Sequence, residues 1–206
     1  MPRVAHVELL VEELSMEATL RLLLPRILGT DGPTFQIHTH LGKANLLRNL
    51  PGRLRAHSKW LPDDWRVFVV VDRDEEDCRD LKECLEVAAR SAHLCTRTDS
   101  GAVCQVVNRI AVEELEAWFF GDMPAVRSAF PRVSPTVEGR APFRNPDAIR
   151  GGTWEALERI LKRAGYFAGG LQKIAVADAV GRHMDPARNT SPSFRHFRDA
   201  LLELTR

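Results

Sequence analysis

Residues 67–77 read VFVVVDRDEED, an apolar, mostly β-branched run that ends abruptly in a cluster of carboxylates. Such a run predicts a strand that is covered on both faces, as in a parallel sheet. Asp72 and Asp74 stand two positions apart, so the strand period would place both side chains on one side. Two carboxylates in that arrangement can share a hard divalent cation such as Mg²⁺. The carboxyl ends of parallel strands are also where open α/β sheets bind ligands.

The same residues have a structural alternative, because Asp caps helices and Glu is favoured in the first helical turn. Residues 75–77 are expected to do this for a helix that runs to about Ser91. Taken alone, Asp72 and Asp74 leave metal binding and helix capping as open alternatives. A third carboxylate from another strand end would favour the metal.

A third carboxylate is available near the N-terminus. Residues 4–11 form a second apolar run, which ends at Glu12, and a helical pattern follows that Pro25 should kink or divide. If both strands belong to one parallel sheet, their carboxyl ends share one edge. Glu12 would then converge with Asp72 and Asp74 on a metal ion.

Two short motifs carry a family resemblance: residues 11–17, VEELSME, and residues 70–74, VVDRD. Together they resemble the Toprim signature of type IA and type II topoisomerases, DnaG-type primases and OLD-family nucleases. The resemblance implies that Glu12, Asp72 and Asp74 are catalytic and bind Mg²⁺ or Mn²⁺. Toprim proteins usually carry Gly after the first Glu, whereas Glu13 stands here and is expected to alter the loop or compete as a ligand.

A closer resemblance is to a bacterial family related to Toprim, domain of unknown function 4276. It rests on the opening motif, on EELEAW at 113–118, and on the tail that runs from MDP at 184–186 to SPSF at 191–194. These pieces are spread over most of the chain. The resemblance implies an α/β fold, with a Toprim-like, mainly parallel sheet flanked by helices and a helical C-terminal extension.

Further candidates for the metal site come from acidic residues at other element ends. A strand expected at 103–112 is followed by acidic residues that open a helix, where the helix dipole alone would favour them. Glu114 and Glu116 are candidates to join the site, and the spacing does not choose between them. Glu17 is a third candidate for a second metal position.

Basic and polar residues in the C-terminal part supply the remaining candidates. OLD-type nucleases use a Lys near the metals, and the resemblance makes Lys173 a catalytic candidate; a surface Lys is the alternative. His183, Asp185 and Arg188 lie in a polar loop that either lines the cleft or forms a turn. Ser193 is the expected cap of the last helix.

Length and composition favour one domain. The 206 residues, of which 44% are hydrophobic, are expected to form a Toprim-like α/β domain (1–130), a Pro/Gly-rich loop (131–152) and a helical extension packed on the same domain (153–206). Net charge is +1, but it is uneven: 11 Lys+Arg against 7 Asp+Glu from residue 141 onward give +4, and the other 18 and 21 give −3. A basic part beside an acidic sheet suits phosphodiester chemistry, and a solvated surface explains the count equally well.

Several classes of protein are disfavoured. The sequence lacks a run of about 20 apolar residues and a secretion signal, so a cytoplasmic protein without membrane contact is expected. The four cysteines form no C-x-x-C pair and are expected to be free. Gly42-Lys43 is not a Walker A loop, so the chain should not hydrolyse ATP itself. OLD nucleases carry a fused ATPase, and an ATPase partner in trans is therefore expected.

The sequence thus predicts magnesium-dependent cleavage of nucleic acid. One alternative is another Asp-x-Asp enzyme, either a HAD-type phosphatase or a nucleotide-sugar transferase. A second is a non-catalytic adaptor that works with a separate ATPase. The choice between DNA and RNA and the oligomeric state stay open.

Overall fold

One parallel sheet forms the centre of the molecule. The computed structural model describes residues 3–99, 103–170 and 172–205. Its strands are β1 (His6–Val11), β2 (Thr34–Thr39), β3 (Trp65–Asp72) and β4 (Val106–Ala111), in the order β2-β1-β3-β4. All the pairings are parallel. The expected α/β fold with a parallel sheet is confirmed, and the arrangement is consistent with a Toprim-like fold.

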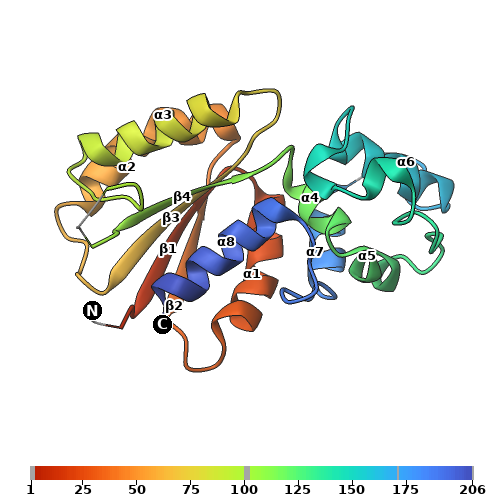
Figure 1. Ribbon diagram of the computed structural model, residues 1–206, viewed down its shortest axis with the longest axis horizontal. Coiled ribbons are helices and arrows are strands. Elements are labelled where there is room, and N and C mark those ends of the chain that lie inside the picture. Colours follow the sequence, from red (N-terminus) through yellow and green to blue (C-terminus); the bar gives the residue numbers. More distant parts are fainter. Residues whose placement is uncertain (1–2, 100–102, 171, 206) are drawn as a thin grey trace.

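Helices cover both faces of this sheet (Figure 1). The crossover helices are α1 (Leu14–Leu28), α2 (Lys43–His57) and α3 (Cys78–Ser91). The later elements are α4 (Leu115–Phe120), α5 (Met123–Ala129), the 3₁₀ turns η1 (Ala141–Phe143) and η2 (Pro146–Ala148), α6 (Thr153–Arg163), α7 (Lys173–Gly181) and α8 (Pro192–Leu204). Helices α2 and α3 pack on one face, and α1 and α8 on the other. Helices α4 to α7 gather beyond the end of the sheet where β4 leads into α4.

Strand β3 is buried on both faces, which explains its uninterrupted apolar sequence. Residues 67–71 are fully buried. Phe68 and Val70 pack into the core beneath α1 and α8, whereas Val67, Val69 and Val71 pack into the core beneath α2 and α3. A strand with apolar neighbours on each side has no position that favours a polar residue. The interpretation of this run as a buried strand is confirmed.

Two helices contain a proline in their interior. Helix α1 is not divided at Pro25, which excludes one of the two expected outcomes, and α2 continues through Pro51. Proline removes one main-chain hydrogen bond from a helix interior. In α2 the burial of Leu46, Leu50 and Leu54 on the sheet offsets that loss. The sequence pattern indicates a helix from Leu171 to Gly181; Leu171 lies outside the described residues, and α7 begins at Lys173.

The cap of α8 is Ser191 and not Ser193, which corrects a prediction. The Ser191 hydroxyl accepts a hydrogen bond from the Phe194 N–H at 3.2 Å, and Pro192 occupies the first helical position. The Ser193 hydroxyl instead accepts from Trp118 Nε1 at 3.1 Å. Ser193 therefore ties α8 to α4.

Four cysteines occur in the chain and all are free thiols, as expected. Among the described residues, no helix is both long enough and apolar enough to cross a membrane.

The outer edge of β4 is protected by two cations. The carbonyl oxygens of Gln105 and Ala111 accept hydrogen bonds from the N–H groups of Val67 and Arg73 in the neighbouring strand. Because successive carbonyls along a strand point to opposite sides, the Asn108 carbonyl points away from the sheet. Lys82 Nζ and an Arg109 guanidinium nitrogen both donate to the Asn108 oxygen at 3.0 Å. A cavity of about 660 Å³ lies beside this edge, between α3 and α8.

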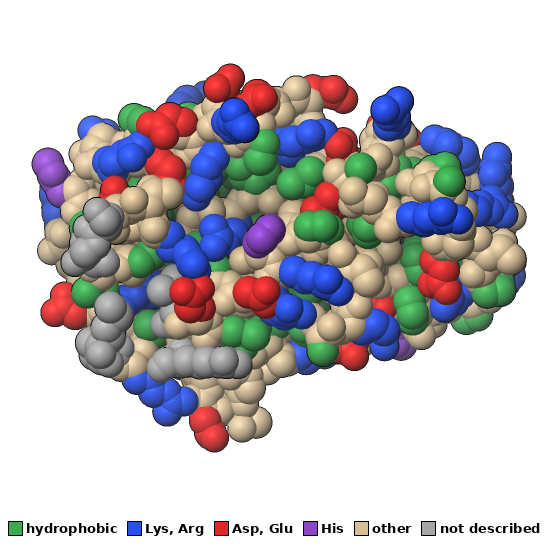
Figure 2. Space-filling view, viewed as in Figure 1, with side chains coloured by type: hydrophobic (Ala, Val, Ile, Leu, Met, Phe, Trp, Pro, Cys, Tyr) green, Lys and Arg blue, Asp and Glu red, His purple; other side chains and the backbone are tan. Residues whose placement is uncertain are grey.

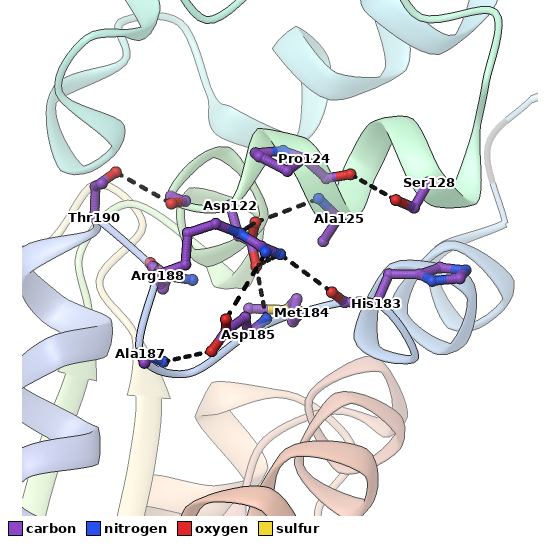
Figure 3. A network of polar contacts seen from close by, with 12 residues as sticks. Asp122, Pro124, Ala125, Ser128, His183, Met184, Asp185, Ala187, Arg188 and Thr190 are labelled. Atoms are coloured by element: carbon purple, nitrogen blue, oxygen red, sulfur yellow. Dashed lines mark hydrogen bonds and ion pairs between the residues drawn. The ribbon is translucent and has the colours of Figure 1, made fainter.

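The loop between α7 and α8 is held by a buried carboxylate (Figure 3). Asp122, fully buried between α4 and α5, accepts hydrogen bonds from Arg188 Nε at 2.7 Å and from the Asp185 N–H at 2.7 Å. The Asp185 side chain in turn accepts from the Ala187 N–H at 2.9 Å. The polar residues of this loop therefore form a turn that joins α5 to α8.

Replacing Asp122 with Asn should destabilise the protein by about 2–3 kcal/mol, because the Arg188 guanidinium loses its anionic partner. Urea denaturation of the Asp122→Asn variant would measure this change. The matched control is Asp178→Asn, which removes an exposed ion pair with Arg182 and should change stability by less than about 0.5 kcal/mol. Equal effects of the two substitutions would contradict a structural role of Asp122.

Glu86 of α3 is a second buried carboxylate with a structural role. Its oxygens accept hydrogen bonds from Asn108 Nδ2 at 3.1 Å and Thr98 Oγ1 at 2.9 Å, and it pairs with Lys82. Burial by itself raises the pKa of Glu86. The hydrogen bonds from Lys82 and Asn108 lower the pKa by more than burial raises it, and the net pKa is about 2. The carboxylate therefore stays ionised in the folded chain.

This low pKa predicts acid sensitivity. A carboxylate whose pKa is lower in the folded chain stabilises the fold when the pH is above its pKa in the unfolded chain. That stabilisation is lost as the pH falls through its pKa in the folded chain. Wild type should lose more stability than Glu86→Gln between pH 4.5 and about pH 2. Thermal denaturation across that range would measure the difference, with exposed Glu83→Gln as the control. Parallel pH profiles of wild type and Glu86→Gln would contradict the assignment.

Candidate metal centre at the carboxyl edge of the sheet

Acidic residues gather where β1, β3 and β4 end. Glu12 directly follows β1, Asp72 ends β3, and Glu116 lies two residues after the cap of α4. Strands β1 and β3 are neighbours, and the chain leaves β1 towards β2 on the opposite side. This is a topological switch point, the position where open α/β sheets form a crevice for ligands.

Glu12 and Asp72 form a buried carboxyl pair. Their exposed fractions are 4% and 9%, and each carboxyl group affects the pKa of the other. Glu12 Oε2 and Asp72 Oδ1 have no hydrogen-bond partner and are inaccessible to solvent. Burial raises the pKa of Glu12 to about 7. Burial and the adjacent Glu12 carboxyl raise the pKa of Asp72 well above its ordinary value.

Glu116 adds a third buried carboxyl, with an exposed fraction of 3%. Burial, and then repulsion from Glu114, raise its pKa to about 7. Its charge also acts on Asp72, raising the pKa of that group. Glu114 has a different neighbour, because its Oε2 accepts from Thr153 Oγ1 at 2.9 Å and from the Trp154 N–H at 2.8 Å. Of the two candidates at the start of α4, Glu116 is buried and acts electrostatically on Asp72, whereas Glu114 binds the first turn of α6.

Asp74 lies at the surface beyond the end of β3, so the strand period does not place its side chain, although its charge raises the pKa of both Glu12 and Asp72. The backbone leaves the strand after Asp72, and Asp74 has φ of 50°, in the left-handed region. Its side chain is half exposed and its carboxylate lies 2.7 Å from Lys43 Nζ. Lys43 also contacts Glu76 Oε1 at 3.0 Å and donates to the Arg73 carbonyl at 3.0 Å.

Glu17, the acidic candidate on α1, has a different partner. Glu17 forms an ion pair with Arg21, one helical turn further along, at 2.8 Å from Arg21 Nε. Glu13 precedes α1 and its Oε2 lies 3.7 Å from Lys173 Nζ. Glu13 therefore faces a cation.

Lys173 reaches this edge because α7 packs along α1. Arg26 near the end of α1 donates to the carbonyls of Gly181 and Met184 at 2.9 and 2.8 Å, which fixes the end of α7. The start of α7 then brings Lys173 to Glu13, with its Nζ 5.1 Å from the centre of the Trp154 ring. Burial lowers the pKa of Lys173, but Glu116 and Glu13 raise it more, so the side chain stays a cation.

The sequence analysis missed two cations, Lys43 and Arg73. Arg73 pairs with Glu113, whose φ of 65° turns the chain after β4. Lys43 begins α2, and the preceding Gly42 N–H donates to the Glu12 carbonyl at 3.0 Å. The available signal was the position of Gly42-Lys43 after the second strand, which was considered only as a nucleotide-binding loop.

The buried carboxyls fit a hard divalent cation in their chemistry. Mg²⁺ and Mn²⁺ prefer carboxylate oxygens, and two such oxygens, on Glu12 and Asp72, are buried without partners. Within residues 3–99, 103–170 and 172–205, however, no three His, Cys, Asp or Glu side chains are arranged to hold a metal ion. The ion pair of Asp74 with Lys43 draws one candidate ligand away from the buried pair.

Comparison with known proteins identifies one family. The model of the family described as "Domain of unknown function (DUF4276)" matches residues 11–202. No curated protein and no solved structure gives a significant match.

The raised pKa of Glu12 predicts a stability penalty at neutral pH. A carboxyl whose pKa is higher in the folded chain contributes stability when the pH is below its unfolded pKa of 4.5. This contribution is lost as the pH rises through the folded pKa of about 7. Without divalent cations, Glu12→Gln should exceed wild type in stability above pH 7 by about 1–2 kcal/mol. Thermal denaturation in a chelator would show the gain, which should vanish at acid pH.

The control for this measurement is Glu138→Gln, which removes an exposed carboxylate paired with Arg127. Its effect should not vary over the same pH range. A constant difference between wild type and Glu12→Gln at all pH values would contradict the buried carboxyl pair.

Proposed function

Because the chain belongs to the DUF4276 family, we propose from its site that it is a Toprim-type, Mg²⁺- or Mn²⁺-dependent phosphodiesterase that cleaves nucleic acid. The observation that carries this proposal is the buried Glu12–Asp72 pair at the switch point, with two carboxylate oxygens that lack partners. Burying an ionisable group costs free energy, and groups with strongly shifted pKa values cluster at functional sites. A relationship to the OLD-family nucleases is part of the proposal.

Glu12 and Asp72 would hold the cation, with Glu116 and Asp74 completing its coordination. When bound, a divalent ion supplies a water of lowered pKa and neutralises charge on the leaving oxygen. The Glu12 and Glu116 carboxyls would ionise for that purpose, since their pKa values of about 7 lie within reach of physiological pH. Their oxygens would also orient the attacking water by accepting its hydrogen bonds.

Lys173 would stabilise the phosphate. Its Nζ lies on the same side as Glu13 and Glu116, so the ammonium faces the carboxyl edge and not bulk solvent alone. A fixed cation beside developing negative charge lowers the barrier of phosphoryl chemistry. The ring of Trp154 supports the ammonium from one side.

The helical part beyond this edge would contact the nucleic acid backbone. Residues 123–170 contain eight Lys and Arg against four Asp and Glu. Figure 2 shows Lys and Arg side chains spread over the end of the molecule that carries α5 and α6. Cationic surfaces bind phosphate backbones without regard to base sequence. A basic surface next to an acidic metal centre favours a polyanionic substrate in the cytoplasm.

A non-catalytic adaptor is the second candidate, because Asp74 is held by Lys43 and no metal-binding group of three is arranged among the described residues. In that role the chain would bind nucleic acid and act with a separate ATPase. Recovery of an ATPase with the chain from its native host, without cleavage by either protein, would favour this candidate.

Asp72→Asn should reduce Mn²⁺-dependent cleavage by at least about 10²-fold, because a metal ligand is lost while the shape of the side chain is kept. Lys173→Met should reduce it by about 10-fold or more. Cleavage of single-stranded DNA, duplex DNA and RNA would measure both effects. The matched control, Glu203→Gln, removes an exposed pair with Arg97 and should leave the rate unchanged.

Circular dichroism of each variant would confirm that it folds. Full activity in Asp72→Asn, or wild-type cleavage that persists in a chelator, would rule out the proposed mechanism. No cleavage by wild type on any substrate would favour the adaptor.

A further inference from the structure

Lys43 pairs with Asp74, one of the candidate metal ligands, and is itself nearly buried. Its side chain is 11% exposed, although its partners Asp74 and Glu76 are about half exposed. Burial lowers the pKa of Lys43, but the hydrogen bonds to Asp74 and Glu76 raise it more, so it stays protonated. Its charge also lowers the pKa of Glu12, which places it within the field of the buried pair. The ammonium therefore balances charge where a metal ion would do the same.

The contacts of Lys43 occupy one candidate ligand. Asp74 Oδ2 lies 2.7 Å from Nζ, the distance of a charge-assisted hydrogen bond. The Arg73 carbonyl and Glu76 take the other donors of the ammonium, both at 3.0 Å. The Oδ2 atom held in this way is less available to a metal ion. The Lys43 ammonium therefore competes with a cation for Asp74.

We propose that Lys43 is an internal counter-ion that is exchanged when nucleic acid binds, so that substrate and metal bind cooperatively. The inference rests on the proposed function and names how its site is regulated. A phosphate of the substrate would accept the Lys43 ammonium and release Asp74 to the metal. Lysine suits this exchange because its ammonium is a compact charge on a flexible four-carbon stem, and it binds phosphate as readily as carboxylate.

The location of Lys43 favours a phosphate as the incoming partner. It begins α2, directly after Gly42, whose N–H is bonded to the Glu12 carbonyl at 3.0 Å. The start of α2 therefore lies beside the Glu12 backbone, and the ammonium contacts the carbonyl of Arg73, the residue after Asp72, on the edge of the sheet where substrate would lie. The positive end of the α2 dipole at the same position adds to the attraction for an anion.

Calorimetric titration with Mn²⁺ tests the proposal on four samples: wild type and Lys43→Met, each with and without a short phosphorothioate oligonucleotide that resists cleavage. Wild type should bind Mn²⁺ about 10-fold more tightly when the oligonucleotide is present. Lys43→Met should bind Mn²⁺ about 10-fold more tightly than wild type without it, since no ammonium competes for Asp74. Addition of the oligonucleotide should then improve its affinity little.

The matched control is Arg90→Met, which removes one positive charge from an exposed ion pair with Glu83 on α3. Its Mn²⁺ affinity and its response to oligonucleotide should equal those of wild type. Reciprocity adds a check on unmodified protein, because Mn²⁺ must raise the affinity for oligonucleotide by the same factor. This second measurement needs no variant to fold.

Two outcomes separate the two proposals. If Mn²⁺ binds and Asp72→Asn abolishes binding, but Lys43→Met binds Mn²⁺ no more tightly than wild type, the exchange is overturned and the metal site stands. If neither protein binds Mn²⁺ with or without oligonucleotide, the metal site itself is overturned, and the exchange with it.

Discussion

Two carboxyl groups are buried against each other where the central strands β1 and β3 end, and much of the structure accommodates that contact. Glu12 and Asp72 repel when both are ionised, and burial removes the water that would screen them. Without a cation, folding holds protons on this pair and raises the pKa values. Three cations, Lys43, Arg73 and Lys173, lie around the edge and each pairs with a carboxylate at its rim. The edge therefore carries carboxyl groups at its centre, and the carboxylates at its margin are paired with cations.

The helical part makes this arrangement rigid. Helix α7 runs along α1 and is fixed by Arg26, so Lys173 is positioned by packing and not by a loose surface loop. The turn after α7 is tied back to α4 and α5 by Asp122, and α8 then returns to cover the sheet. Glu114 binds the first turn of α6 and fixes the start of that helix against α4. Side chains around the candidate site thus come from elements whose relative positions are held by buried polar contacts.

The sequence was sufficient where one local rule decided the outcome. The apolar run before Asp72 could only be a strand buried on both faces, and its carboxyl end located the acidic edge. Local rules failed where tertiary contacts compete with them. Burial of three leucines carried α2 through Pro51, and Pro192 at the first helical position favoured Ser191 over Ser193 as the cap. The positive φ at Asp74 and the choice of Glu116 over Glu114 depend on where neighbouring chains pass. Neither can be read from spacing.

The capped carbonyl of Asn108 has a consequence for solubility. An edge strand with free main-chain groups can template the addition of a strand from another molecule, which begins aggregation. Strand β4 is such an edge, but Lys82 and Arg109 occupy its outward carbonyl and place positive charges where a second strand would have to approach. An incoming strand would have to displace both cations and desolvate them, and the Thr96–Val106 bridge already covers the start of the edge, so charge and chain cover together oppose intermolecular pairing.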